Sequence, residues 1–111
     1  MMQNYLAIVL KNIACEPGTF IYQLHEESRF DPNLFQAYYA GLRGISAADT
    51  DMATLLKIIS TNTFILRCLI YHFLPEDLYV IKNLPSDISD YVQKIDVANH
   101  HLMQSISDGL S

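Results

Sequence analysis

The chain has 111 residues, half of them hydrophobic, and a formal net charge of −5 from 12 acidic and 7 basic side chains. This length is sufficient for one domain with a real hydrophobic core, and 4 glycines and 4 prolines are too few for a disordered chain. The bases are scattered along the sequence with no two adjacent, which excludes the basic patch that nucleic-acid recognition requires. We therefore expect a single domain over residues 1–111 with no nucleic-acid partner.

Helical spacing of apolar residues predicts two helices before residue 30. The first starts at Tyr5 and ends before Pro17, because proline disfavours helix in the residue that precedes it. The second is short and covers 19–27. Cys15 and Cys68 lie in apolar stretches far apart in the sequence, so we expect two reduced core thiols. Because residues 1–10 also lack a secretory signal, we expect a cytoplasmic protein.

A third helix is predicted after Asp31 and Pro32. The carboxylate of Asp31 can cap the free amides of the first turn, and proline is tolerated at the first helical position. Gly41 and Gly44 are expected to loosen and then stop this helix.

The most apolar run of the chain, at about 50–74, predicts a central helix. A capping box at 46–49 is expected to start it, and little of its second half should face water. The polar residues 60–63 compete for backbone hydrogen bonds, so 47–74 is either one kinked helix or two. Three polar or charged side chains interrupt the run and argue against a membrane span: Lys57, Asn62 and Arg67.

Two further helices are expected, a short one over 75–83 and a long one from about Ile88 to Ile106. Asp90 and Lys94 are spaced as an i,i+4 ion pair on the long helix. No window alternates with a period of two, so no sheet is expected. The fold class is all-α: a compact orthogonal bundle of six or seven helices around the central helix.

No motif for catalysis or metal binding is complete in this sequence. A zinc-protease pattern begins at His25, but Arg29 stands where the second histidine is required. His100 and His101 are adjacent on a helix and point about 100° apart, so they cannot share one metal ion. His72 is expected to be a packed histidine whose charge suits a helix carboxyl terminus. We expect no enzymatic activity, no metal and no cofactor.

The chain has 7 tyrosines and no tryptophan. Tyr38 and Tyr39 are consecutive, so one helix face cannot bury both. The outward ring either belongs to an interface, where tyrosine is enriched, or covers a neighbouring helix.

In size, charge and helicity the whole chain resembles bacterial immunity proteins, which block toxin domains delivered by contact-dependent inhibition systems or bacteriocins. No residue motif carries the resemblance, so it assigns no functional residues. It implies a non-enzymatic inhibitor that neutralises a basic toxin domain. The alternative is a helical adaptor or regulatory domain that binds a partner peptide or helix in an apolar groove.

The acidic residues near helix starts indicate where a basic partner would bind. Asp49 and Asp51 lie about 30 Å from the other acids if the central helix has about twenty residues. The acids that follow the central helix are close enough in sequence to form one patch, with a tyrosine as aromatic anchor. The expected partner-binding residues are Glu76, Asp77, Asp87 and Asp90, with Tyr79 or Tyr91 as the anchor. We expect no membrane partner.

Overall fold

A computed structural model describes residues 5–45, 50–74 and 80–110. Within these ranges the chain forms helices and no strand. The all-α class is therefore confirmed. The expected number of six or seven helices is wrong, because the described ranges contain five. They are α1 (Tyr5–Ile13), α2 (Phe20–Glu26), α3 (Pro32–Gly44), α4 (Met52–Phe73) and α5 (Ile88–Leu110).

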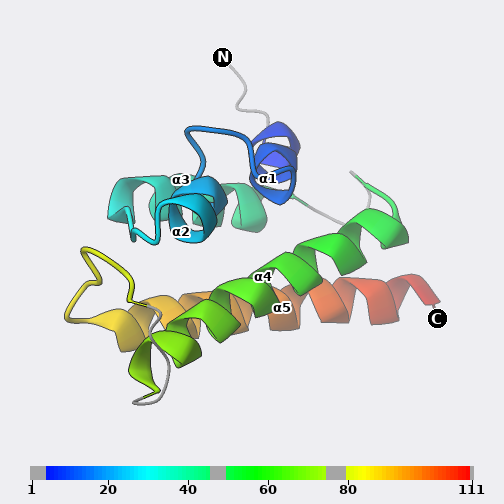
Figure 1. Cartoon of the computed structure of the whole chain (residues 1–111). Helices are drawn as coiled ribbons and strands as arrows, with labels where there is room; N and C mark the ends of the chain where they lie inside the picture. Colours follow the sequence, from blue (N-terminus) through cyan, green and yellow to red (C-terminus); the bar gives the residue numbers. More distant parts are fainter. Residues whose placement is uncertain (1–4, 46–49, 75–79, 111) are drawn as a thin grey trace.

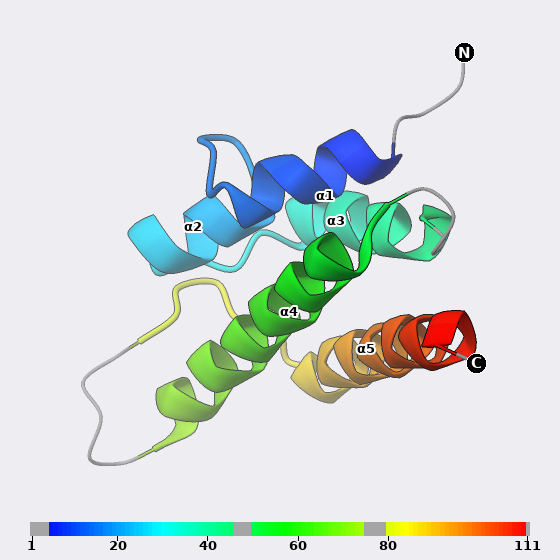
Figure 2. The same ribbon diagram turned by 90° about the vertical axis from the view of Figure 1, so that its right-hand side faces the viewer.

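The helices form two layers, with α1, α2 and α3 in one and α4 and α5 in the other (Figure 1). Helix α1 crosses α5 steeply: α1 is seen nearly end-on in Figure 1, where α3 and α5 lie across the view, and in Figure 2 α1 lies across the view instead. Helices α4 and α5 lie side by side in opposite directions, so the end of α4 is close to the start of α5. The described bundle is compact, with a radius of gyration of 14.2 Å.

Aromatic side chains form much of the core between the layers. The ring of Phe20 meets Phe30 and Phe35 edge to face, with ring centroids 5.1 and 5.2 Å apart. Tyr91 of α5 meets the same two rings edge to face at 5.0 and 4.9 Å. Such contacts add to the hydrophobic gain from burying large rings. This cluster joins α2, α3 and α5.

Polar caps fix the start of two helices. Asp31 accepts hydrogen bonds from the amides of Asn33 and Leu34 at 3.0 and 3.1 Å, which confirms the predicted start of α3. Asp51 is the cap of α4 and accepts from the amide of Thr54 at 2.8 Å. The central helix therefore begins at Met52, close to the expected start at about residue 50. The expected capping box at 46–49 lies outside the described residues.

The central helix α4 is continuous through its polar stretch. Thr61 donates its hydroxyl to the carbonyl of Lys57 at 2.9 Å, and Thr63 donates to the carbonyl of Ile59 at 3.0 Å. These bonds reach back one turn, so they satisfy the hydroxyls without opening the helix. Of the two alternatives for this segment, the structure has one helix.

The second half of α4 is less buried than expected. Ile65 is fully buried, whereas Leu66 is half-buried. Ile70 and Phe73 keep 59% and 60% of their surface exposed, so the expectation that little of this segment faces water is wrong. The reason is that α5 and the α1–α3 layer cover only one side of α4.

A polar chain crosses the core. The phenol of Tyr38 (α3) donates to Oδ1 of Asn62 (α4), and Nδ2 of Asn62 donates to Oδ1 of Asn99 (α5) at 2.8 Å. Burial raises the pKa of the Tyr38 phenol, so the group remains a donor at neutral pH. Every buried side-chain nitrogen and oxygen atom among the described residues has a hydrogen-bond partner, so this chain of bonds fixes how α3, α4 and α5 pack together.

Gly41 and Gly44 have a packing role that the sequence interpretation missed. A Cβ atom on Gly41 would lie 2.9 Å from Cγ2 of Val9 and 3.2 Å from the carbonyl oxygen of Tyr5. A Cβ on Gly44 would overlap the Tyr5 ring. Helix α3 continues through Gly41 to Gly44, so these glycines let α1 approach α3 closely rather than loosen the helix.

A helix was expected over 75–83, of which 75–79 lie outside the described residues. Residues 80–83 are not helical, and we call this segment the clip. Lys82 pairs with the α2–α3 loop: its amide donates to the carbonyl of Ser28 at 2.7 Å, and its carbonyl accepts from the amide of Phe30 at 2.9 Å. Ile81 is buried, and its amide donates to Nδ1 of His72 at 2.9 Å. These longer-range bonds replace the helical ones, so the expected helix is wrong at 80–83.

Candidate partner-binding groove

The two consecutive tyrosines of α3 point to different environments. Tyr38 has no exposed surface and belongs to the core, whereas Tyr39 is half-buried. The Tyr39 ring stacks on Phe35 with centroids 6.1 Å apart, and it reaches the space between α3 and α5. Of the two alternatives for the outward ring, the one in which Tyr39 covers a neighbouring helix is confirmed, and the one in which it belongs to an interface stays a prediction.

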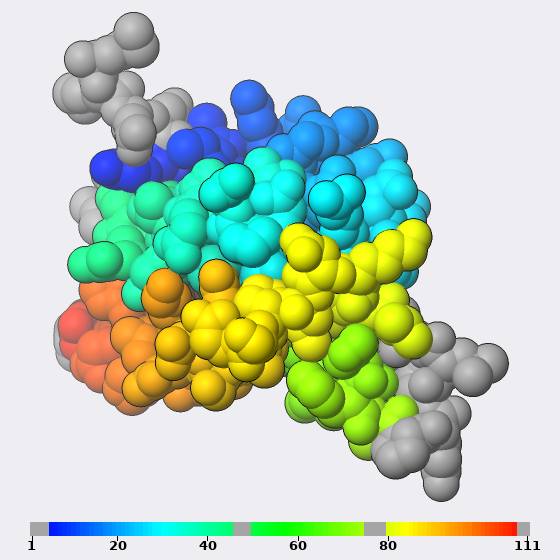
Figure 3. Space-filling model, turned by 90° about the vertical axis from the view of Figure 1, so that its left-hand side faces the viewer, coloured from blue at the N-terminus to red at the C-terminus, as the bar shows by residue number. Residues whose placement is uncertain are grey.

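Two adjoining hollows, of about 340 and 220 Å³, lie between α3 and α5, and together we call them the α3–α5 groove. Figure 3 shows this seam from one side, with α3 (cyan to green) above α5 (orange). Tyr39 and Val97 border both hollows. The larger hollow is also bordered by Asp87, Asp90, Tyr91, Gln93 and Lys94. The smaller one is also bordered by Leu42, Arg43, Ala98 and His101.

Cationic side chains lie over the aromatic rings of the groove. Nζ of Lys94 is 5.6 Å from the centroid of the Tyr39 ring and 5.5 Å from that of Tyr91. The guanidinium of Arg43 is 5.8 Å from the Tyr39 centroid. These distances are within the range of cation–π attraction. The expected ion pair between Asp90 and Lys94 is absent, because the ammonium has turned to the rings instead.

The structure brings together three of the residues expected to bind a partner. Asp87, Asp90 and Tyr91 border the larger hollow, and both carboxylates are exposed with no ion-pair partner in the described part of the chain. The Tyr91 ring also packs in the aromatic core, so only part of it is available at the surface. The other three expected residues lie outside the described residues: Glu76, Asp77 and Tyr79.

The sequence interpretation left Tyr39 and Lys94 out of this group. The spacing of Tyr91 and Lys94, which stand one turn apart on α5, indicates that their side chains can meet. Nothing in the sequence places Tyr39 opposite them, because that contact depends on how α3 crosses α5.

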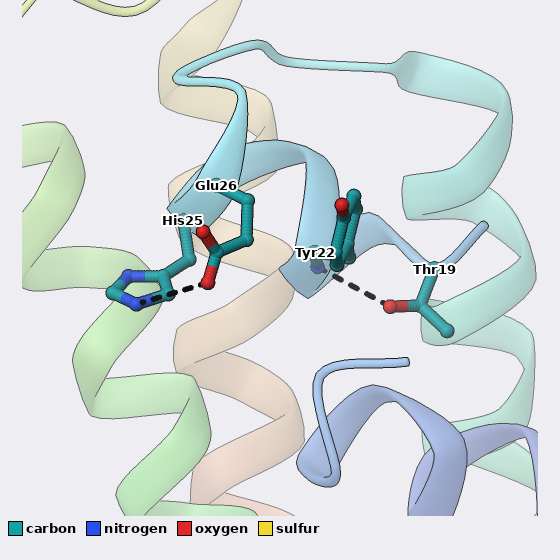
Figure 4. Close-up of polar contacts among 4 residues, drawn as sticks. All are labelled: Thr19, Tyr22, His25 and Glu26. Carbon is teal, nitrogen blue, oxygen red and sulfur yellow. Dashed lines mark hydrogen bonds and ion pairs between the residues drawn. The ribbon is translucent and has the colours of Figure 1, made fainter. Parts of the chain in front are cut away.

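A separate hollow, of about 260 Å³, lies between α2 and α4. Cys15, His25 and Phe64 are among the residues that border it. Figure 4 shows that the His25 ring points toward α4, with Nε2 3.7 Å from Oε1 of Glu26. The same view shows the amide of Tyr22 donating to the hydroxyl of Thr19 at the start of α2. Burial, followed by the charge of Glu26, raises the pKa of the Cys15 thiol. A raised pKa leaves less thiolate, so this cysteine is not activated as a nucleophile.

The end of α4 carries a cluster of exposed apolar side chains: Ile70, Tyr71, Phe73, Leu74 and, from the clip, Val80. Among the described residues α4 is also the one helix long and apolar enough to cross a membrane, and 33% of its most apolar stretch is buried. The core helix of a globular domain can pass the same test. The buried hydrogen bonds of Asn62 to α3 and α5 are typical of such a core helix.

His72 lies half-buried at the end of α4, as expected for a packed histidine. Its Nδ1 atom accepts a hydrogen bond from the amide of Ile81 at 2.9 Å, and this bond ties the clip to the end of α4. The expectation that its charge suits the helix terminus stays a prediction.

Within the described residues no three histidine, cysteine, aspartate or glutamate side chains gather as a metal site. The α3–α5 groove brings aromatic rings beside carboxylates and cations. No protein family, curated protein or solved structure matches the chain, so its function has to be argued from this surface.

Proposed function

We propose that the chain is a non-enzymatic bacterial inhibitor, an immunity protein that neutralises a basic toxin domain of the contact-dependent inhibition or bacteriocin type. The observation that supports this most is the larger hollow of the α3–α5 groove, where Asp87 and Asp90 stand exposed beside the rings of Tyr39 and Tyr91, with no ion-pair partner among the described residues. Tyrosine is enriched at surfaces that bind another protein, and exposed carboxylates attract a partner of opposite charge.

Electrostatics adds a reason for a basic partner. The formal charge of the chain is −5, and attraction between opposite charges accelerates the encounter of two proteins. Toxin domains that act on nucleic acid are basic because they must bind phosphate. In this proposal the inhibitor remains in the cytoplasm of a bacterial cell and covers the toxin domain there.

A helical adaptor or regulatory domain is the second candidate. It is favoured by the exposed apolar side chains at the end of α4, of which Phe73 and Val80 keep 60% and 62% of their surface. Apolar surface of this kind suits a partner peptide or helix.

Co-expression tests the first proposal. The toxin domain encoded beside this chain's gene is induced in bacterial cells with and without the chain, and survival and complex formation are measured. We expect survival only with the chain and a one-to-one complex on gel filtration. A matched mutation of the toxin's catalytic residue supplies the control for toxicity. Cells that die at the same rate with and without the chain would contradict the proposal.

The site is tested separately with that complex. Replacing Glu76, Asp77, Asp87 and Asp90 by Gln or Asn should slow association about tenfold at low salt and flatten its salt dependence. Asp51 and Asp108, replaced by Asn, provide a control of like chemistry at other helix ends. If the quadruple variant keeps the rate and salt slope of the unmodified chain, the partner binds another surface.

A further inference from the structure

The side chain of Lys94 holds an unusual position for a surface lysine. Its ammonium lies over two rings from different helices, 5.6 Å from the centroid of Tyr39 and 5.5 Å from that of Tyr91. A carboxylate stands one turn earlier on the same helix, at Asp90, yet the two groups form no ion pair. The ammonium of Lys94 thus lies over the two rings, although the carboxylate of Asp90 is only one turn away on the same helix.

The surroundings of this ammonium contain several groups that attract a cation and one further cation. The face of an aromatic ring is the negative part of its quadrupole, and Asp87 and Asp90 border the same hollow. The guanidinium of Arg43 lies 5.8 Å from the Tyr39 centroid, so this ring already accepts a guanidinium of the chain itself. Because the hollow has a volume of about 340 Å³ and is open to solvent, a group of the size of a guanidinium can enter it.

We propose that the Tyr39–Tyr91 site binds a cationic side chain of the partner, an arginine guanidinium first of all, and that Lys94 occupies the site in the free protein as an internal competitor. The proposal rests on the proposed function, because a basic partner supplies the cation. A planar guanidinium stacks on a ring and can also donate hydrogen bonds to Asp87 or Asp90, which an ammonium does less well.

A lysine can make this exchange because its long side chain is flexible and its ammonium is well hydrated outside the groove. On binding, the ammonium of Lys94 leaves the rings and the guanidinium takes its place. Removing the positive charge at Lys94 should therefore make the site bind external cations more tightly. A purely structural lysine would not have this effect.

The test uses the full chain and methylguanidinium chloride as probe, with binding followed by NMR of the Tyr39 and Tyr91 ring protons. We expect saturable shifts of both rings in Lys94→Gln, with an affinity about fivefold higher than that of the unmodified chain. Adding Asp87→Asn and Asp90→Asn to Lys94→Gln should remove most of this gain. Sodium chloride at equal ionic strength controls for screening, and Lys57→Gln, at an exposed position of α4, controls for the loss of one charge.

Two outcomes would overturn the proposal. One is shifts that rise linearly with methylguanidinium in Lys94→Gln, without saturation. The other is an equal gain in affinity in Lys57→Gln, which would mean that overall charge and not this site controls binding. The titration uses methylguanidinium and no partner protein, so its failure would reject this site without contradicting the proposed function. A failed co-expression test would contradict the proposed function, and the titration would still test the site.

Discussion

The phenol of Tyr38 and the side-chain amide of Asn62 are 24 residues apart in the sequence and form a buried hydrogen bond between α3 and α4. The side chain of Asn62 in turn donates a hydrogen bond to Asn99 of α5. A polar chain of this kind is stabilising only if every member is satisfied, because an unpaired buried amide loses its bonds to water and gains nothing in return.

Tyr38→Phe is therefore expected to lower the free energy of unfolding by about 1–3 kcal/mol, because it leaves Oδ1 of Asn62 without its donor. Urea unfolding followed by circular dichroism measures the change. Tyr71→Phe removes the same hydroxyl from a side chain that is 41% exposed, and it should change stability little. Equal losses in the two variants would mean that the buried bond contributes nothing specific.

Gly41→Ala is expected to destabilise the protein by about 1–3 kcal/mol, although alanine is normally the better helix former. The added methyl group would lie 2.9 Å from Cγ2 of Val9, which forces α1 away from α3. The double variant Val9→Ala/Gly41→Ala should lose less stability than the sum of the single variants, because shortening Val9 removes part of the overlap. Strict additivity in thermal or urea unfolding would contradict this contact.

His72 is expected to hold the clip through the hydrogen bond that its Nδ1 atom accepts. His72→Phe removes the acceptor of the Ile81 amide, so that amide should exchange its hydrogen faster. His72→Asn keeps an acceptor oxygen near the same place and should preserve more of the protection. Nitrogen NMR of the unmodified protein should show Nδ1 without a proton. Equal exchange at Ile81 in both variants would show that this bond does not hold the clip.

Acid should weaken the cap of α4. Hydrogen bonds from the side chain and the amide of Thr54 lower the pKa of the Asp51 carboxyl below its usual value. A carboxyl whose pKa is lower in the folded state adds stability above its unfolded pKa, and it loses this contribution as the pH falls through the folded value. The stability difference between the unmodified chain and Asp51→Asn should therefore be constant near neutrality and shrink below about pH 4.

Urea unfolding at several pH values measures that difference. Asp96→Asn, at an exposed position in the middle of α5, is the matched control. The effect should be small, because the cap is exposed to solvent. A difference that grows on acidification would have the wrong sign and would contradict the role of the ionised cap.

Local chemistry in the sequence was sufficient to predict most of the helices. The Asp31–Pro32 start of α3 is confirmed because capping depends only on residues within one turn of each other. Helical spacing also predicts which face of α5 points inward: Ile95, Asn99 and Leu102 are buried as expected, whereas Val92 of the same stripe is exposed. Asp87, Asp90 and Tyr91 were expected to share one surface, and they border one hollow because they are close in sequence around the start of α5.

What the sequence by itself determined is thus the helical class, the apolar central helix and the acidic character of the chain. Only the tertiary structure decided that 80–83 forms a clip on the α2–α3 loop, that Asn62 is a core residue, and that Tyr39 meets Lys94 across two helices. The physical reason is the range of the contacts. Caps and periodicity depend on residues a turn apart, whereas these features depend on how helices distant in sequence cross and on which side of α4 is left uncovered.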